Sequence, residues 1–271
     1  MRGLKALTRR SALCFMLMHF TDRLLTGGGR CGKIARPMLE VRNISFAWGK
    51  TPLLDDVTFS VSPGEVAALV GANGAGKTTL MKILAGVILP ASGTVLADGN
   101  DTFANPLRFH RLMGYLPENC PAEPDMTVKN YLTYRARLKG EMVKKIRHRV
   151  QEAMSTCGLD ARADSRIGRL SLGLRKRVAL ADALLLRPRF LLLDDLLAGL
   201  DPVTRASLGR ILSTVAMFAT VVVSGHELDE LEAYTNKFLV LKDGRMLGAK
   251  TAVGVKTLLL PPEKQGGRGA K

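Results

Sequence analysis

Residues 71–78 read GANGAGKT and match the pattern G-x-x-x-x-G-K-[S/T] at every fixed position. The five residues before them, 66–70, form an uninterrupted apolar run typical of a short buried strand, and residues 77–85 have the spacing of an amphipathic helix. Glycines in the connecting loop allow the backbone N–H groups to point inward, and the start of the helix adds a partial positive charge. The sequence therefore predicts a strand, a loop and a helix that together form a concave site for phosphate groups.

Two further observations assign roles around this loop. Lys77 is placed to reach the β- and γ-phosphates of a nucleotide, and the hydroxyl of Thr78 is placed to bind Mg²⁺. Residues 190–193 form a second apolar run, and Asp194 follows it where the Mg²⁺ ligand of such a site belongs. A glycine-rich turn without a ligand is the alternative, but it does not account for the flanking elements. We therefore expect ATP or GTP to bind here with Mg²⁺, although these two motifs do not identify the class of ATPase.

The composition excludes a chain that is mainly disordered. With 271 residues, 46% hydrophobic and 24% charged, the chain can bury a large core. Its net charge of +16 would ordinarily suggest nucleic acid or an anionic membrane surface as a partner. Residues 1–37 supply +7 of that charge, however, so the main body is only moderately basic. We expect no specific nucleic-acid partner.

The cysteines and the hydropathy pattern restrict the protein further. The four cysteines, at positions 14, 31, 120 and 157, fit no spacing typical of metal ligands or redox sites, and we expect reduced thiols. No stretch approaches the roughly 18 to 20 uninterrupted apolar residues of a membrane-spanning helix. These features predict a soluble or peripheral protein.

The first 37 residues allow two interpretations. A basic start is followed by an apolar run of about nine residues at 12–20, which resembles a poor targeting segment but lacks a convincing cleavage site. The other interpretation is a disordered extension or an upstream start that does not belong to the domain, because a strand pattern begins abruptly at Met38. We favour the second, with a domain at 38–250 and a flexible tail at 251–271.

Hydrophobic periodicity along this domain predicts an α/β fold. Strands are predicted at residues 38–48, 56–61, 66–70, 94–97, 113–116, 190–193 and 221–224, with a final hairpin of 238–241 and 245–247. Helices are predicted at residues 77–85, 128–138, 141–156 and 174–186, and another begins at Pro202. The expected architecture is a P-loop NTPase core with a mixed sheet, an antiparallel β subdomain and a helical subdomain inserted at about 120–170.

Further landmarks occur in the order and spacing of ATP-binding cassette (ABC) ATPases, so the chain resembles that family over nearly all of residues 38–250. LSLGLRKR at 170–177 is similar to the ABC signature, which separates this family from other P-loop proteins. The segments AWG at 47–49, GYLPEN at 114–119, AGLDP at 198–202 and SGH at 224–226 resemble four other family loops.

The resemblance implies a role for one residue in each of these segments. Trp48 would stack on the adenine ring, although core packing is an alternative for this side chain. Glu118 would approach the Mg²⁺ and the membrane subunit, and Asp201 belongs to the loop through which two subunits communicate. His226 would contact the γ-phosphate. Ser171 and Gly173 would bind the γ-phosphate of ATP held by a partner subunit.

The resulting site is predicted as follows. The residues assigned to catalysis are Lys77, Glu118, Asp195 and His226. Those assigned to Mg²⁺ are Thr78, Glu118 and Asp194. Those assigned to nucleotide binding are Trp48, Gly71, Asn73, Gly74, Ala75, Gly76, Lys77, Thr78, Thr79, Ser171, Gly173 and Asp201.

Asp195 is the most consequential departure from the family pattern. The family normally has a glutamate there, which orients or deprotonates the attacking water. Aspartate is one methylene shorter, roughly 1.5 Å, and a misplaced base can lose part of the about 10²- to 10⁴-fold contribution of acid–base catalysis. We therefore expect slow but nonzero hydrolysis. Glu118 replaces the usual glutamine, and Leu196-Leu197 replaces the usual Pro-Thr without an explanation at the level of sequence.

The resemblance implies an ATP-hydrolysing subunit of an ABC transporter. It would pair with a second nucleotide-binding subunit, identical or different, beneath separate membrane permease subunits at the cytoplasmic face of a bacterial cell membrane. GYLPE followed by a Met-Thr-Val helix start is similar to the exporter branch. One alternative is a hydrolysis-weakened cassette that acts as an ATP-dependent dimerisation switch. Another is a soluble cassette acting on DNA or ribosomes, which only the net charge favours.

Overall fold

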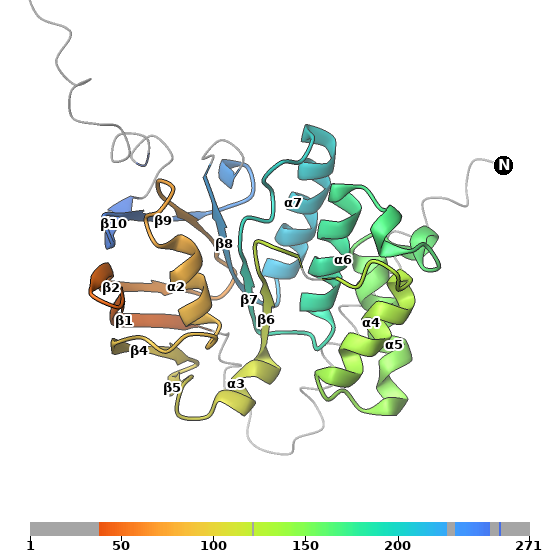
Figure 1. Ribbon diagram of the computed structural model, residues 1–271, viewed down its shortest axis with the longest axis horizontal. Helices are drawn as coiled ribbons and strands as arrows, with labels where there is room; N and C mark the ends of the chain where they lie inside the picture. Colours follow the sequence, from red (N-terminus) through yellow and green to blue (C-terminus); the bar gives the residue numbers. More distant parts are fainter. Residues whose placement is uncertain (1–37, 121, 227–230, 250–254, 256–271) are drawn as a thin grey trace, which may run out of the picture. The chain divides into compact units, whose positions relative to one another are not determined.

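The central six-stranded sheet has the strand order β10-β9-β3-β8-β7-β6 (Figure 1). The computed structural model describes residues 38–120, 122–226, 231–249 and 255. The strands are β3 (Val66–Val70), β6 (Met113–Leu116), β7 (Phe190–Leu193), β8 (Thr220–Gly225), β9 (Lys237–Lys242) and β10 (Arg245–Ala249). All neighbours pair in parallel except β9 and β10, which form an antiparallel hairpin. The predicted mixed sheet is confirmed.

Burial on both faces explains why the parallel strands are continuous apolar runs. Every residue of β3, β7 and β8 is buried, as expected for parallel strands that are covered on both sides. Parallel strands also end at one edge of the sheet, which is where ligands bind in open α/β folds. The loops after β3, β6, β7 and β8 therefore leave from the same edge.

A second, antiparallel sheet has the order β2-β1-β4-β5. Its strands are β1 (Leu39–Trp48), β2 (Thr51–Val61), β4 (Ser92–Ala97) and β5 (Asn100–Asp101). The predicted antiparallel pair is confirmed, but β2 begins five residues earlier than the expected residue 56. Asp56 has a left-handed φ of 52°, and its Oδ1 accepts a hydrogen bond of 2.6 Å from the Nδ2 of Asn43. The register between β1 and β2 shifts in this region, which hides the alternation of a regular strand.

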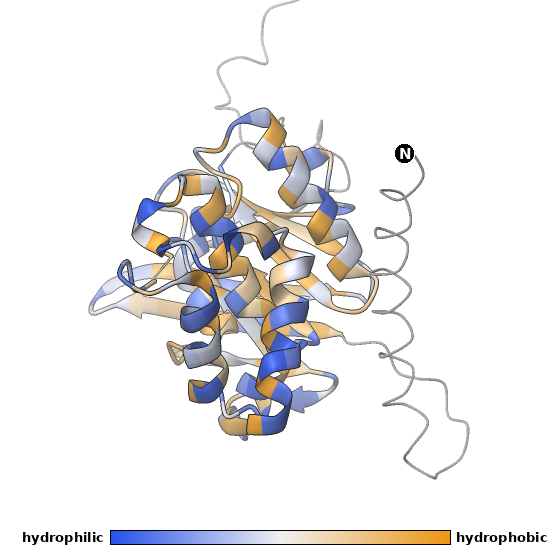
Figure 2. Cartoon of the chain, turned by 90° about the vertical axis from the view of Figure 1, so that its right-hand side faces the viewer, coloured by the Kyte–Doolittle hydropathy of each residue, from blue (hydrophilic) through white to orange (hydrophobic). Residues whose placement is uncertain are grey.

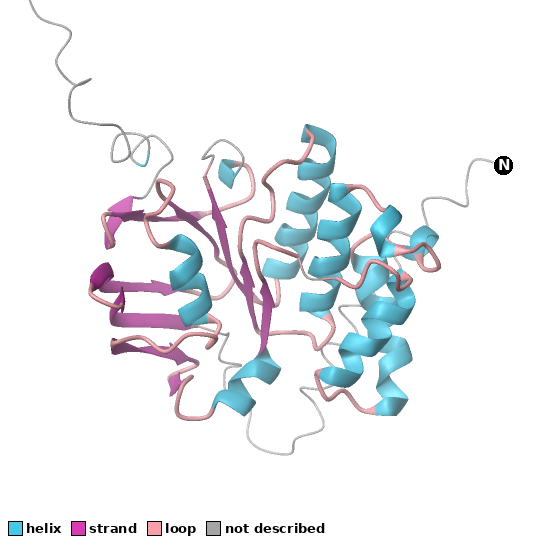
Figure 3. Cartoon of the chain, viewed as in Figure 1, coloured by secondary structure: helices cyan, strands magenta, loops and turns pink. Residues whose placement is uncertain are grey.

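Helices cover both faces of the central sheet (Figures 1 and 3). The helices are α2 (Lys77–Leu84), α3 (Pro106–Leu112), α4 (Val128–Leu138), α5 (Val143–Thr156), α6 (Leu172–Leu184) and α7 (Pro202–Ala216), with short 3₁₀ turns at Asp160–Arg162 and Ile167–Arg169. Helix α3 was not predicted, because it is short and buries only Phe109. Pro106 opens it, and the side chain of Asn105 caps it.

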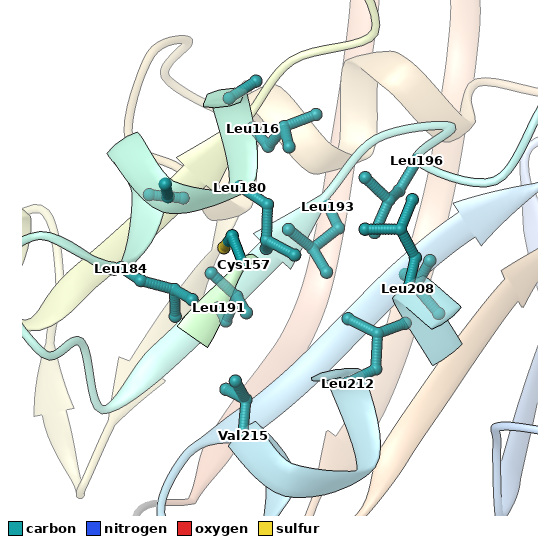
Figure 4. Packing of buried hydrophobic residues seen from close by; sticks show 14 of the residues in the cluster. Leu116, Cys157, Leu180, Leu184, Leu191, Leu193, Leu196, Leu208, Leu212 and Val215 are labelled. Atoms are coloured by element: carbon teal, nitrogen blue, oxygen red, sulfur yellow. The ribbon is translucent and has the colours of Figure 1, made fainter. Parts of the chain in front are cut away.

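The sheet separates two hydrophobic clusters. One lies between the two sheets around α2, and the other lies on the opposite face, where α4 to α7 pack. Figure 4 shows part of the second cluster, with Leu180 of α6, Leu193 of β7 and Leu212 of α7. The strands are mostly hydrophobic, whereas the helices mix hydrophobic and hydrophilic positions (Figure 2). The helices thus bury one side and leave the other to solvent.

Ion pairs connect the inserted helices to α6. The Asp182 carboxylate of α6 lies 3.0 Å from Arg135 and 2.8 Å from Lys139, both at the C-terminal end of the α4 region. Burial lowers the pKa of the Lys139 ammonium, and the charge of Asp182 opposes that effect. On α5, Glu152 pairs with Arg187 at 2.6 Å, just beyond α6. These partly buried pairs hold α4 and α5 against α6.

Two predictions concern residues outside this description. The expected extension at 1–37 and the expected tail at 251–271 fall outside the described residues, apart from residue 255. Among the helices that are described, none has both the length and the apolar character needed to cross a bilayer.

Helix α4 allows a direct test of the packing. Leu132 is fully buried, whereas Leu138 on the same helix is 60% exposed. We expect Leu132→Ala to lower the free energy of unfolding by about 2–5 kcal/mol, because it removes buried methyl groups and leaves a cavity. Leu138→Ala should change that free energy by about 0.5 kcal/mol or less. Urea denaturation of both variants measures the difference, and equal effects would contradict the assigned packing.

Candidate functional site

The loop between β3 and α2 requires glycine at three positions. Gly74 and Gly76 have φ values of 79° and 101°, in the left-handed region that favours glycine. A Cβ atom on Gly76 would lie 2.8 Å from the side chain of Leu54, and one on Gly71 would lie 2.3 Å from the carbonyl oxygen of Leu241. The loop is therefore pressed closely against its neighbours, and its backbone turns as the sequence pattern requires.

Lys77 begins α2, and its side chain folds back over this loop. Its Nζ donates hydrogen bonds of 2.8 Å to the carbonyl oxygen of Gly71 and 2.9 Å to that of Ala72. Burial lowers the pKa of the ammonium, while three nearby carboxylates raise it, those of Asp195, Asp194 and Glu118. The structure thus brings together the cation and the three acids that the sequence placed in one site.

Asp194 follows β7 and is 2% exposed. Its Oδ1 accepts a hydrogen bond from the hydroxyl of Ser224 at the end of β8. Within the described residues, its Oδ2 is buried and has no hydrogen-bond partner. A buried carboxylate oxygen without a donor is a suitable ligand for a cation, and Mg²⁺ usually takes one or two carboxylates together with phosphate oxygens. The buried oxygen of Asp194 therefore fits a Mg²⁺ ion, for which the sequence also assigns Thr78, at the start of α2.

Asp195 and His226 meet although 31 positions separate them. The Nε2 of His226 lies 3.4 Å from the Oδ2 of Asp195, and the His226 side chain is 46% exposed. Asp195 itself has a φ of 53°, and its backbone N–H donates to the hydroxyl of Ser224 at 3.0 Å. One serine therefore contacts both acids, and the left-handed turn at Asp195 directs the two consecutive carboxylates into different surroundings.

The structure gives a physical account of Leu196 and Leu197. Their side chains are 0% and 2% exposed and belong to the cluster that includes Leu193 and Leu208 (Figure 4). The residues after Asp195 are thus anchored in the core by apolar burial. Sequence reasoning had no explanation for this pair, because the direction of the chain after Asp195 depends on its unusual φ.

Tyr115 was missed by the sequence analysis, although it lies in the segment GYLPEN that was singled out for Glu118. Its hydroxyl is buried and has no hydrogen-bond partner within the described residues. Burial raises the pKa of Tyr115 to about 12, and the charges of Asp194 and Glu118 add to that effect. The phenol therefore stays protonated and is available as a donor next to the acids. The pairing of β6 with β7 is the signal that places it there.

The signature and communication segments lie at the starts of two helices. Ser171 is exposed and caps α6, with its hydroxyl accepting from the N–H of Leu174 at 3.4 Å. Asp201 caps α7 by accepting from the N–H groups of Val203 and Thr204 at 3.1 and 3.0 Å. Hydrogen bonding to Thr204 lowers the pKa of the Asp201 carboxyl. Both residues have a local capping role, and the exposed hydroxyl of Ser171 remains accessible from outside.

A Cβ on Gly173, in the same segment, would lie 2.6 Å from the Cγ2 of Thr204. The glycine therefore allows α6 and α7 to approach each other closely.

A cavity of about 840 Å³ lies next to the phosphate loop. Its walls are formed by residues 45–47, 52–55, 72–75, 91 and 242–244. Trp48 follows the first of these segments, is 57% exposed, and contacts the ring of Phe46 edge to face at 5.1 Å. Core packing as an explanation of Trp48 is therefore wrong. The cavity has the size of a site for a small organic ligand, and its walls include residues 72–75 of the phosphate loop and residues 45–47, directly before Trp48.

The fold and these residues define a P-loop protein, with a glycine-rich loop after β3, a buried acid after β7 and a helical subdomain packed on α6. Residues 54–198 match the family described as "ABC transporter". The chain belongs to this family and is an ATP-binding subunit of the ABC transporter type.

Individual proteins support the same assignment. An uncharacterized ABC transporter ATP-binding protein, YxlF of Bacillus subtilis strain 168, is 33% identical over 77% of this chain and 69% of its own length. The Nod factor export ATP-binding protein I of Burkholderia orbicola strain AU 1054 is 31% identical over 83% of this chain and 73% of its own length. The structure of CbiO1 from Clostridium perfringens, part of the ABC transporter complex CbiONQ, has a TM-score of 0.73 at 26% identity and covers 81% of this chain and 90% of its own.

The unpartnered oxygen of Asp194 leads to a prediction about Mg²⁺. We expect Asp194→Asn to reduce the gain in ATP affinity that Mg²⁺ provides, because an amide is a weaker ligand than a carboxylate. The affinity should rise about tenfold with Mg²⁺ over EDTA in the unchanged protein, or about 1.4 kcal/mol, and less than about threefold in the variant. Equilibrium binding of a fluorescent ATP analogue measures both values. Asp164→Asn, at an exposed position, is the control, and an unchanged Mg²⁺ effect in Asp194→Asn would exclude this ligand.

Proposed function

We propose that this chain hydrolyses ATP and couples ATP-driven dimerisation and hydrolysis to the export of a substrate through separate membrane subunits. The observation that carries the proposal is the contact of Asp195 with His226 beside the buried acid Asp194. An acid that can accept a proton and a histidine that can contact phosphate thus meet at the edge of the sheet where the phosphate loop begins.

Hydrolysis at this site needs mainly positioning and charge stabilisation. Lys77 would exchange its two backbone acceptors for phosphate oxygens, and the loop N–H groups would hold the same phosphates. Asp195 would orient the attacking water and accept its proton as the new oxygen–phosphorus bond forms and the bond from the γ-phosphorus to ADP breaks. His226 would contact the γ-phosphate and keep Asp195 directed toward the water. Mg²⁺, held by Asp194 and Thr78 with Glu118 nearby, would neutralise the charge on the β- and γ-phosphates.

The exposed start of α6 supports the proposed dimer. Ser171 presents its hydroxyl at the N-terminal end of a helix, where the partial positive charge attracts phosphate. In the proposed arrangement, Ser171 and Gly173 of one subunit complete the γ-phosphate site of a second subunit, identical or different. Nucleotide would then hold the dimer together, and hydrolysis would release it.

The relatives support the direction of transport and the assembly. The Nod factor protein is named for export, and CbiO1 is part of a larger transporter complex. We propose that this chain likewise acts beneath permease subunits at the cytoplasmic face of a bacterial cell membrane. The substrate would be chosen by those permease subunits.

A hydrolysis-weakened cassette is the second candidate, and the short side chain of Asp195 favours it. In that case ATP would act mainly as a dimerisation switch. The two candidates share nucleotide binding and differ in turnover, so each needs its own test.

Binding and pairing are tested with Lys77→Ala. We expect this change to weaken ATP affinity about 100-fold or more, because it removes a buried charge-assisted contact to phosphate worth about 2–3 kcal/mol or more. It should also abolish the dimer that forms with a non-hydrolysable ATP analogue. Isothermal calorimetry and light scattering measure these effects, with Lys82→Ala on the same helix as the control. Unchanged affinity and pairing would refute the proposed nucleotide site.

Turnover is tested at Asp195 in the full complex with the cognate membrane subunits. We expect slow ATP hydrolysis that falls to background in Asp195→Asn, because the amide cannot accept the proton. Asp195→Glu should raise kcat by about tenfold if reach limits the rate, within the range of general acid–base effects. A phosphate-release assay measures all three proteins. Turnover in the unchanged protein no greater than in Asp195→Asn would support the hydrolysis-weakened cassette instead.

A further inference from the structure

Lys176 lies on α6 and reaches into the segment that carries Asp195. Its side chain is buried, with only 7% of the residue exposed. Its Nζ donates hydrogen bonds of 2.8 Å to the carbonyl oxygen of Asp195 and 2.7 Å to that of Ala198. One ammonium group therefore holds both ends of residues 195–198.

The same segment is fixed on its other sides. The hydroxyl of Ser224 accepts the N–H of Asp195, and the side chains of Leu196 and Leu197 are buried in the core. The left-handed φ of Asp195 is uncommon for residues other than glycine, although aspartate adopts it more readily than most. Such a conformation persists where its surroundings hold it. Lys176 supplies two of the contacts that do so.

The backbone matters here because the side chain of Asp195 is short. An aspartate has one rotatable bond fewer than a glutamate, so the position of its carboxylate follows closely from the position of its Cα. Among the described residues, the ion pair of that carboxylate with His226 is 3.4 Å long and lies at a partly exposed edge. The position of the Asp195 carboxylate relative to an attacking water therefore depends mainly on the backbone of Asp195, which Lys176 holds.

We propose that Lys176 is a positioning residue for ATP hydrolysis, which holds the backbone of Asp195 so that its short carboxylate reaches the attacking water. This inference rests on the proposed function of Asp195. Because α6 begins next to Ser171, Lys176 also connects the catalytic acid to the helix end that would bind the partner's nucleotide. A displacement of about 1 Å at a reacting group can cost about 100-fold in rate, so loss of Lys176 should lower kcat by about 10- to 100-fold.

The chemistry of the lysine suggests the variants. An ammonium has three donors on a flexible stem, which suits two carbonyl acceptors that lie three residues apart. Methionine has a similar length and apolar stem but no donor, so Lys176→Met leaves two carbonyl groups without this partner. Lys176→Arg keeps several donors and should restore much of the function. Lys144→Met, at an exposed position of α5, is the matched control.

Two measurements on the full-length protein test the proposal. The first is amide hydrogen exchange, which reports how often a segment opens and does not depend on activity. In Lys176→Met we expect faster exchange in peptides covering residues 195–201 and unchanged exchange in those covering α4, with protection regained in Lys176→Arg. The second is steady-state ATPase activity with the cognate membrane subunits. We expect the loss in kcat stated above, a KM for ATP within about threefold, and recovery of at least about one third of kcat in Lys176→Arg.

The outcomes separate the possibilities. Unchanged exchange at 195–201 together with an unchanged kcat in Lys176→Met would overturn the proposal, as would faster exchange there with an unchanged kcat. If Lys176→Met unfolds the whole chain, Lys176→Arg decides: retained protection and kcat support the positioning role, and full protection with lost kcat refutes it. If the unchanged protein hydrolyses no more ATP than Lys77→Ala, the proposed hydrolysis fails. Hydrogen exchange then tests the contact separately. If residues 195–201 exchange no faster in Lys176→Met than in the unchanged protein, Lys176 does not hold this segment and the positioning role fails as well.

Discussion

The parallel pairing of β3, β8, β7 and β6 is the constraint on which the candidate site depends. Val70 pairs with Gly225, and Leu193 pairs with both Val223 and Leu116. Because these strands run in one direction, the residues that follow them leave the sheet at one edge. Parts of the chain that are far apart in sequence are thereby brought to within a few ångströms. A change of one residue in this register would move the acids to the other face of the sheet.

Helix α6 connects this edge with the inserted helices. Through Asp182 it binds Arg135 and Lys139 at the end of the α4 region, and through Lys176 it binds the backbone beside Asp195. Its start is the exposed end that carries Ser171. Helix α6 thus contacts both the inserted helices and the segment that carries Asp195, so a shift of the helical subdomain can be passed to that segment. The two consecutive acids differ in their surroundings, since Asp194 is buried and hydrogen-bonded to Ser224, whereas Asp195 contacts His226 at the partly exposed edge.

Sequence reasoning succeeded where a pattern was continuous and failed where it was interrupted. The predicted strands at 113–116 and 190–193 and the helix at 128–138 have the observed bounds, since their apolar residues recur without a break. The first half of β2 was missed because its alternation is broken by bulges. Helix α3 was missed because one buried residue produces no periodicity. The hydroxyl of Tyr115 was missed because its surroundings come from another strand.

The sequence by itself determined the fold class and the phosphate loop, because eight consecutive residues and the flanking apolar runs encode a local geometry. It also named the residues expected around that loop through their resemblance to a family. Only the tertiary structure decided that Asp195 contacts His226, that Lys176 holds the segment after Asp195, and that Leu196 and Leu197 are buried. The physical reason is that these contacts join residues tens of positions apart, so that sheet register and helix packing, rather than any local pattern, set their distances.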